Sequence, residues 1–394
     1  MRFSEYAMSI IRRIIEETDG RLPGSDNERK AAEMIAEELR KYCDEVHIED
    51  FELRPGGFLG FIPISVALIV VAYILWFLPP LSLVFALAAF VITYMEFFRY
   101  AEFVDPLFPK RISQNVYGKI KAKGERRKLI IVSGHHDSAP VYLLMQLNPY
   151  FYVFEVLLAF ITLGTMIIAA LIGTVTYFIS IPILDLVREI LRIALLVMLP
   201  LAFPMVFFRS ISRGTPGATD NLSAVAVALA VAKYLHENPD VIPEGTEVWI
   251  ASFGSEEAGL RGSRRFVRRH LEELEGQETY VLNMEMLVNP EELAIITREK
   301  TTRTKLSQLL AQKLKKICED IGIKIKMAEL PTIGGGTDAV SFARAGIDAV
   351  TIIGAEFSIK TFRYYHTVRD TPDKINPEIL DLAGRIIIEG IKKL

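Results

Sequence analysis

The segment TEVWIASFGSEEAGLRGSRRFVRRH (residues 246–270) contains the pattern that decides the fold. It begins with the apolar run TEVWIASFG, whose β-branched and aromatic residues predict a buried strand. A basic helix is predicted near 261–270, and a pair of glutamates stands between strand and helix. A strand that leads into a helix is the repeating unit of a parallel sheet, so this segment favours an α/β fold.

The same alternation continues through the polar part of the chain. Further strands are predicted over 46–53, 115–122, 127–134, 279–287, 293–297, 322–328 and 348–354. Further helices are predicted over 1–20, 25–42, 221–237, 302–319, 337–345 and 376–392. The helix at 25–42 opens with Ser25 and Glu28, the spacing of a capping box. We therefore predict an α/β fold with a mostly parallel mixed sheet and helices on both faces.

Two apolar blocks interrupt this pattern. From residue 57 to 98 the only charge is Glu96, and Pro79-Pro80 divides the block into halves of about 20 residues, each long enough to cross a bilayer. The second block has apolar stretches near 156–179 and 190–208, separated by a segment with Asp185, Arg188 and Glu189. We predict two transmembrane hairpins, 57–100 and 149–208, inserted into one domain formed by 1–56, 112–140 and 214–394. Buried helices of a large soluble core are the alternative interpretation.

The overall composition fits this division. Hydrophobic residues make up 51% of the chain although 24% are charged, a balance more typical of an enzyme with a membrane portion than of a soluble one. The net charge is −3 and no basic block is present, which argues against a nucleic-acid partner. Cys43 and Cys318 are far apart, so neither a disulfide framework nor a thiolate metal site is expected.

Polar motifs follow several predicted strands, where ligands bind in open α/β sheets. GHHDS (134–138) follows the strand KLIIVSG, and His135 has a carboxylate, Asp137, two residues on that could orient the ring of a metal ligand. His136 is a second candidate ligand, without a carboxylate at that spacing. Alternatively, histidine and aspartate form an ordinary hydrogen-bonded pair.

Two acidic motifs come next in the chain. Asp220 lies in GATDNLSAVAVAL before an Ala- and Val-rich helix, where it could cap the helix or bridge two metal ions. Glu256 and Glu257 follow the strand quoted first. Two adjacent buried carboxylates need compensating positive charge, so a metal ligand beside a general base is one interpretation and a solvated turn is the other.

Two further residues complete the set. Glu285 lies within the apolar strand VLNMEMLV (281–288), and a buried carboxylate there requires a metal or another cation. His366 lies in the loop YYHTVRDTPD (364–373) before the last helix, where a solvated histidine is the alternative. Two imidazoles and three carboxylates without thiolates favour a catalytic site for two divalent ions, zinc, cobalt or manganese.

In these five motifs and their order, the sequence resembles the co-catalytic di-zinc aminopeptidase family, which includes leucyl-type aminopeptidases and glutamate carboxypeptidases. The resemblance covers 1–56, 112–140 and 214–394. It implies a zinc-exopeptidase-like fold and a site in which the metal ligands are His135, Asp220, Glu257, Glu285 and His366.

The resemblance also implies roles for other residues. Asp137 would orient His135, and Glu256 would be the general base. Asp338, in GGGTDAVSFARAGIDAV, would support the site from behind the ligands, and Tyr365 would stabilise the tetrahedral intermediate. Thr219 stands where many relatives have Asp and Glu285 where Asp is commoner, and the apolar blocks interrupt the domain rather than flank it.

The expected activity is removal of N-terminal residues from peptides, including hydrophobic peptides near the membrane. A carboxypeptidase or amidohydrolase on the same site, and a non-catalytic receptor or transporter with a peptidase-like domain, remain alternatives. Residues 1–56 are assigned to the catalytic domain, His135 lies between the apolar blocks and the remaining ligands follow the second block. Because all of these must meet on one side of the bilayer, each block must cross it an even number of times. Basic residues near the span ends predict that the domain faces the cytoplasm: Arg54, Arg99, Lys110, Arg111, Arg209 and Arg213.

Overall fold

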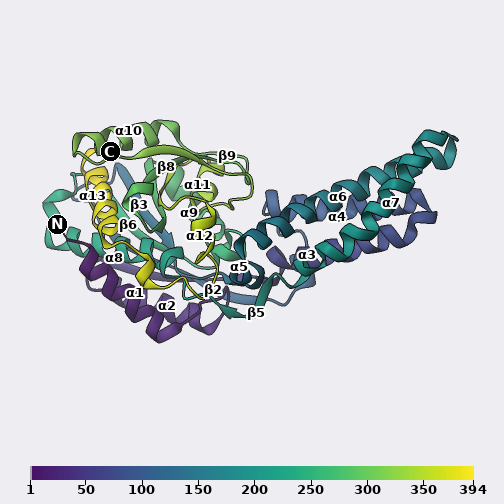
Figure 1. Ribbon diagram of the computed structural model, residues 1–394. Helices are drawn as coiled ribbons and strands as arrows, with labels where there is room; N and C mark the ends of the chain where they lie inside the picture. The colour runs from purple at the N-terminus through teal and green to yellow at the C-terminus, as the bar shows by residue number, and fades with distance from the viewer. Residues whose placement is uncertain (1) are drawn as a thin grey trace. The chain divides into compact units, whose positions relative to one another are not determined.

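The computed structural model describes residues 2–394 and divides into two compact units. The sheet unit comprises the chain up to Pro55, Lys110–Val141 and Ile211–Leu394. The helical unit comprises Gly56–Pro109 and Tyr142–Ser210. Each unit is therefore assembled from segments that are separated in the sequence (Figure 1).

The sheet unit contains a nine-stranded mixed sheet. The strand order is β1-β2-β6-β3-β7-β11-β8-β10, with β9 paired to β8. The neighbouring strands β6, β3, β7 and β11 are parallel, whereas β2 joins β6 and β8 joins β11 in antiparallel pairs. The bounds are β1 Glu45–Leu53, β2 Arg111–Ile120, β3 Lys128–His135, β6 Thr246–Phe253, β7 Glu278–Leu287, β8 Ala294–Glu299, β9 Thr304–Lys305, β10 Lys326–Leu330 and β11 Asp348–Gly354. The predicted mostly parallel mixed sheet is confirmed.

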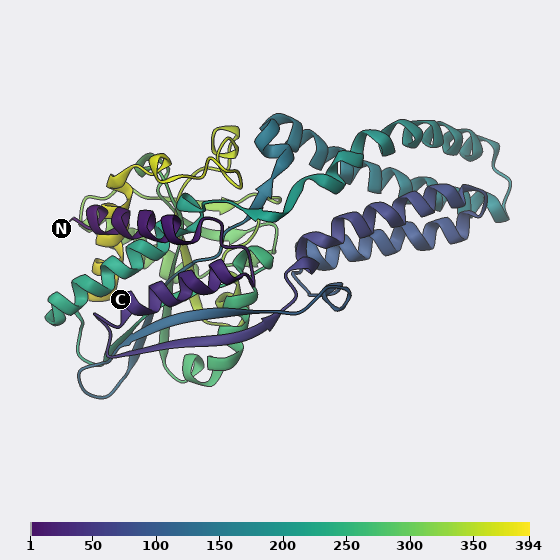
Figure 2. The same cartoon turned by 90° about the horizontal axis from the view of Figure 1, so that it is seen from below.

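Helices cover both faces of this sheet, because alternate strand residues point to opposite sides. Ile130 and Val132 of β3 belong to a core shared with the helices α1, α2, α8, α10 and α13, whereas Leu129 and Ile131 belong to a core shared with α9 and α11. In Figure 2, α1 and α2 (purple) lie beside α8 on the first face. The bounds are α1 Ser4–Thr18, α2 Asp26–Leu39, α8 Ser223–Glu237, α9 Arg261–Glu275, α10 Gln308–Asp320, α11 Ala339–Arg344 and α13 Pro377–Lys393.

The parallel register brings the carboxyl ends of three strands together. Ser133 of β3 is level with Asn283 of β7, and His135 of β3 is level with Phe253 of β6. Side chains at the end of β3, after β6 and near the end of β7 therefore meet at one edge of the sheet, which is where the site lies.

Two predicted elements near residues 300–330 need correction. The helix expected over 302–319 begins only at Gln308, because Ser307 caps it by accepting a hydrogen bond from the Leu310 N–H (3.2 Å). The preceding Thr304–Lys305 pairs with β8 as β9. The strand expected over 322–328 is β10, which pairs with β8 from Lys326 onward.

The helical unit consists mainly of α3 (Gly56–Ile74), α4 (Pro79–Thr93), α6 (Pro149–Phe178) and α7 (Pro182–Ala202). With the turns that continue them, four helices are long and apolar enough to cross a membrane: Gly56–Phe77, Pro79–Phe98, Pro149–Phe178 and Pro182–Phe207. Their shared core contains Ala72, Ala86, Ala89, Ala169 and Ala170, small residues that let helix backbones approach closely.

The second hairpin turns earlier than predicted. Only residues 179–181 separate α6 from α7, and Asp185, Arg188 and Glu189 lie inside α7 rather than between the helices. Pro182 occupies the first turn of α7, where its fixed φ and missing N–H are tolerated, so the helix begins before the charged residues. Short elements complete the chain: α5 (Leu143–Leu147), α12 (Ile359–Phe362) and a two-stranded sheet of β4 (Pro140–Tyr142) and β5 (Arg209–Gly214).

Candidate metal centre

His135, the last residue of β3, begins one group of converging donor atoms. Its Nε2 lies 3.2 Å from Asp220 Oδ1 and 3.3 Å from Glu285 Oε1. Glu256 Oε2 is 3.8 Å from the same nitrogen. All of these side chains are largely shielded from solvent, so one imidazole and three carboxylate oxygens share a small space.

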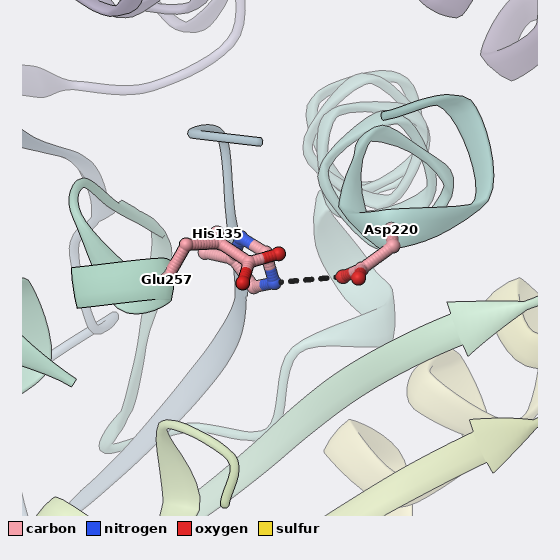
Figure 3. A group of neighbouring side chains, drawn as sticks. All are labelled: His135, Asp220 and Glu257. Carbon is pink, nitrogen blue, oxygen red and sulfur yellow. Dashed lines mark ion pairs between the residues drawn. The ribbon is translucent and has the colours of Figure 1, made fainter. Parts of the chain in front are cut away.

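His366 begins a second group that shares one residue with the first. Its Nε2 lies 3.0 Å from Asp220 Oδ2 and 3.2 Å from Glu257 Oε1. Asp220 therefore offers one oxygen to each histidine. Figure 3 shows His135, Asp220 and Glu257 pointing toward one another, and donor atoms of these three lie within 4.8 Å of each other.

The local structure argues against three alternatives that the sequence left open: a helix cap at Asp220, a solvated turn at Glu256 and Glu257, and His136 as a ligand. Asp220 does not cap α8, because that helix begins at Ser223, and Asp220 lies in the preceding turn with its carboxylate toward the histidines. The side chains of Glu256 and Glu257 are only 11% and 8% exposed, so they are not a solvated turn. His136 points elsewhere, with its Nδ1 2.9 Å from Ser252 Oγ, and burial lowers its pKa to about 4.

Asp137 connects the end of β3 to the acidic turn that follows β6. Its Oδ1 lies 3.2 Å from His135 Nδ1 and accepts a hydrogen bond from the Glu256 N–H (3.0 Å). Its Oδ2 accepts from the Glu257 N–H (3.0 Å). One buried carboxylate thus holds the backbone of both glutamates and lies beside the ring of His135.

Asp370 holds the turn that carries Asp220. Its Oδ1 accepts hydrogen bonds from the Thr219 N–H (2.7 Å) and hydroxyl (2.6 Å), and its Oδ2 accepts from the Asp220 N–H (3.2 Å). The sequence interpretation missed Asp370 although it lies in the quoted loop, four residues after His366. That spacing was the only available signal.

Asn221 links the same turn to β7. Its Nδ2 donates to the Met284 carbonyl (3.1 Å), and its Oδ1 accepts from the Met286 N–H (3.1 Å). These bonds bracket Glu285, and the pairing of β7 with β11 skips Met286, which has a φ of 42°. A bulge re-aims the neighbouring side chain, which is how a strand residue reaches the cluster.

Arg21 is a fully buried cation behind the site that the sequence interpretation also missed. Its Nε donates to the His136 carbonyl (2.7 Å), Nη1 to Asp19 (3.0 Å) and Pro216 (2.8 Å), and Nη2 to Gly217 (3.1 Å). Burial lowers the pKa of Arg21 to about 10, so it stays charged at neutral pH. It joins the end of β3 to the turn before Asp220 and places a permanent positive charge near the carboxylates.

Asp338 and Tyr365 border the cluster. Asp338 is fully buried at the start of α11, where burial raises its pKa to about 6 and it interacts electrostatically with His135. The ring of Tyr365 stacks on His366, with centroids 3.7 Å apart and planes at 22°. Both therefore lie near the converging donors, although neither contributes an atom to the two groups described above.

The electrostatics of the cluster favour added cations. Burial raises the pKa of Glu256 and brings that of Glu285 to about 8. Burial alone would lower the pKa of His366, but Glu257 and Asp220 raise it to about 10. Burial alone would raise the pKa of Asp220, but His135 and His366 hold it well below its usual range. Carboxylates crowded in this way must share protons or bind metal.

The donor set fits divalent zinc. Ligand atoms about 2.0–2.1 Å from a tetrahedral zinc stand about 3.3 Å from one another. The histidine-to-carboxylate distances in the two groups are 3.2 and 3.3 Å in the first and 3.0 and 3.2 Å in the second. If each three-donor group held one ion, further positions at that ion would remain for water and substrate.

Part of the chain matches a known family. The model for peptidase family M28 matches residues 205–391, slightly less than half of the chain. The matched part includes Asp220, Glu257, Glu285 and His366, whereas His135 precedes it.

Named proteins resemble this chain to different extents. Aminopeptidase YwaD of Bacillus subtilis (strain 168) is 31% identical over 185 residues, which is 45% of this chain and 39% of that protein, so the alignment spans about two fifths of the relative. The structure of BSAP, a zinc aminopeptidase from Bacillus subtilis, superposes with a TM-score of 0.58 at 16% identity, covering 98% of this chain and 94% of that one.

Another solved structure shows how far the fold extends. The glutaminyl cyclase of Fimbriiglobus ruber superposes with a TM-score of 0.59 at 12% identity, covering 99% of this chain and 95% of that one. Because proteins named for two different reactions share this fold, the fold alone does not determine which reaction the site catalyses.

Proposed function

We propose that this chain is a membrane-anchored two-metal aminopeptidase. The observation that carries the proposal is the position of Asp220 between two histidines. One of its oxygens faces His135 and the other faces His366, and each histidine also lies near a second carboxylate, Glu285 for His135 and Glu257 for His366. The first ion would be held by His135, Asp220 and Glu285, and the second by His366, Asp220 and Glu257. Zinc is the expected metal, because nitrogen and carboxylate donors suit it and the similar BSAP is a zinc aminopeptidase; the same donors accept cobalt or manganese.

When bound, a pair of such ions would polarise the scissile carbonyl and acidify a water molecule between them. Glu256 is the proposed general base, since its Oε2 is 3.8 Å from His135 Nε2 and its backbone N–H is fixed by Asp137. It would take a proton from the attacking water and deliver it to the leaving amine. Burial raises the pKa of Glu256, which suits a group that accepts and returns a proton.

Two neighbours would assist this reaction. Asp338 would support the ligands electrostatically, and Tyr365 would donate a hydrogen bond to the tetrahedral intermediate, as the stacking on His366 allows. We propose that segments 1–56, 112–140 and 214–394 together form the peptidase domain.

Four apolar helices support membrane anchoring. The chain up to Pro55, which precedes the first hairpin, belongs to the same unit as His135, which lies between the hairpins, and Asp220, which follows them. Both hairpins must therefore return to the side on which they began. Arginine and lysine at the span ends favour the cytoplasm as that side. Lys393→Cys, in a variant lacking Cys43 and Cys318, places a single cysteine at an exposed position and should react with a membrane-impermeant reagent only in inverted vesicles. Labelling in right-side-out vesicles would refute this orientation.

The reaction is tested with peptide pairs that differ only at their ends. In detergent with zinc, the protein should hydrolyse unblocked hydrophobic peptides and leave the same peptides untouched when the N-terminus is acetylated. Cleavage from the carboxyl end would instead indicate a carboxypeptidase, and cleavage of acetylated amides an amidohydrolase. Glu256→Gln is the control, because it should retain zinc and lower turnover by about 10²–10⁴-fold. Full activity of that variant would refute the base assignment.

A further inference from the structure

Glu28 is a buried carboxylate in the first turn of α2 that contacts a residue distant in the sequence, Ser255. Its Oε1 accepts hydrogen bonds from both the N–H (2.7 Å) and the hydroxyl (2.8 Å) of Ser255. Its Oε2 accepts from the Gly24 N–H (2.7 Å). The predicted capping box is thus only half formed, because the Ser25 hydroxyl accepts from the Glu28 N–H (3.2 Å) while the Glu28 side chain is engaged elsewhere.

The residue that Glu28 holds begins the acidic turn, which we define as Ser255, Glu256 and Glu257. Ser255 has φ 53° and ψ 38°, in the left-handed region that non-glycine residues seldom occupy. Such a conformation persists only where surrounding contacts enforce it. Gly254 is equally constrained, because a Cβ there would lie 2.3 Å from the Gln114 carbonyl oxygen.

Three successive N–H groups of the acidic turn are received by two buried carboxylates. Ser255 donates to Glu28, and Glu256 and Glu257 donate to Asp137. The backbone of the acidic turn is therefore held by hydrogen bonds to Glu28 of α2 and to Asp137, which follows β3. The acidic turn sends Glu257 toward His366 and Glu256 toward His135.

We propose that Glu28 is a positioning residue that holds the acidic turn in its catalytic conformation. The inference rests on the proposed function, in which Glu256 is the base and Glu257 binds metal. The Glu28 carboxylate accepts hydrogen bonds from Ser255 and Gly24, and it acts on the site through Ser255. Nearby Ser25 provides a matched control, because it caps the same helix without contacting the acidic turn.

The test compares Glu28→Ala, Glu28→Gln and Ser25→Ala in the full-length protein in detergent. Glu28→Ala should lower kcat on an unblocked peptide by about tenfold or more relative to Ser25→Ala, with KM changed by less than about threefold. Glu28→Gln retains an oxygen for Ser255 and should recover part of the lost kcat. If Glu28→Ala does not fold, the comparison of Glu28→Gln with Ser25→Ala decides, and equal kcat values overturn the inference.

A second measurement is independent of activity. Hydrogen exchange of the zinc-free protein should be at least about tenfold faster at the amides of the acidic turn in Glu28→Ala than in Ser25→Ala. Equal exchange in the two variants would overturn the inference even if both are active. A wild-type protein that hydrolyses no peptide would refute the proposed function instead, while the exchange comparison still decides the role of Glu28.

Discussion

Replacing Asp370 should weaken the metal centre although this residue binds no metal itself. Its carboxylate receives three hydrogen bonds from the turn that carries Asp220: two from Thr219 and one from the Asp220 N–H. In Asp370→Ala these buried donors lose their acceptor. The backbone of the turn then loses its carboxylate acceptor, and the two oxygens of Asp220 are held less firmly between the histidines.

The size of the effect follows from these bonds. A buried donor left without a partner costs about 1–3 kcal/mol, and two N–H groups are affected, whereas the Thr219 hydroxyl can rotate to another acceptor. Burial raises the pKa of Asp370 to about 7, so the wild-type carboxyl is itself destabilised and part of the loss is offset. We expect a net loss of about 2–4 kcal/mol, which corresponds to a weakening of zinc binding by about thirtyfold to a thousandfold.

Zinc affinity measured by chelator competition in detergent checks this expectation. Asp370→Asn keeps an oxygen for Thr219 and presents an amide to the Asp220 N–H, so it should lose only about 1–2 kcal/mol. Asp373→Asn is the control in the same loop, because that side chain is 67% exposed, and it should bind zinc like the wild type. The reasoning is refuted if Asp370→Ala binds zinc as tightly as Asp373→Asn.

Two further predictions concern stability. Gly217→Ala should lower the free energy of unfolding by several kcal/mol, because Gly217 has φ 59° and a Cβ would lie 2.6 Å from Arg21 Nη2. The control Gly322→Ala, at φ 72° with open space around the position, should lower it by only about 1 kcal/mol. Equal shifts in the melting temperatures of the two variants would contradict this prediction. Burial raises the pKa of Glu299 from 4.5 to about 8. Between these two pH values the folded protein keeps Glu299 protonated whereas the unfolded chain does not. The protonated side chain therefore contributes its full stability below about pH 4.5, and this contribution is lost as the pH rises toward 8. Denaturant titrations should therefore show wild type losing stability relative to Glu299→Gln between pH 5 and 8, and a pH-independent difference would contradict the shift.

The fold could be predicted from the sequence because it depends on local patterns that repeat. Apolar strands alternating with helices predicted the mixed sheet, and uninterrupted apolar length predicted the four long apolar helices. The errors lie where a single residue sets a boundary. Pro182 starts α7 before its charged residues, and Ser307 delays α10. Such caps depend on the local conformation of the chain, which composition does not reveal.

The sequence predicted the candidate metal ligands but not the residues that hydrogen-bond to the backbone around them. His135, Glu257 and Glu285 stand out because polar groups at the ends of apolar strands need compensation. Asp370, Arg21 and Glu28 carry no such signal, since each acts on backbone groups from distant parts of the chain. Which carbonyl or N–H a buried side chain will meet depends on the folded arrangement, so these residues became recognisable only in the structure.

The central claim, two metal ions bridged by Asp220, is tested most directly by counting bound zinc. Purified wild-type protein, dialysed against zinc and analysed by atomic emission, should contain about two zinc ions per chain. His135→Ala should lose one ion, whereas Asp220→Ala should lose both. One zinc ion in the wild type that His135→Ala leaves unchanged would contradict the two-metal centre.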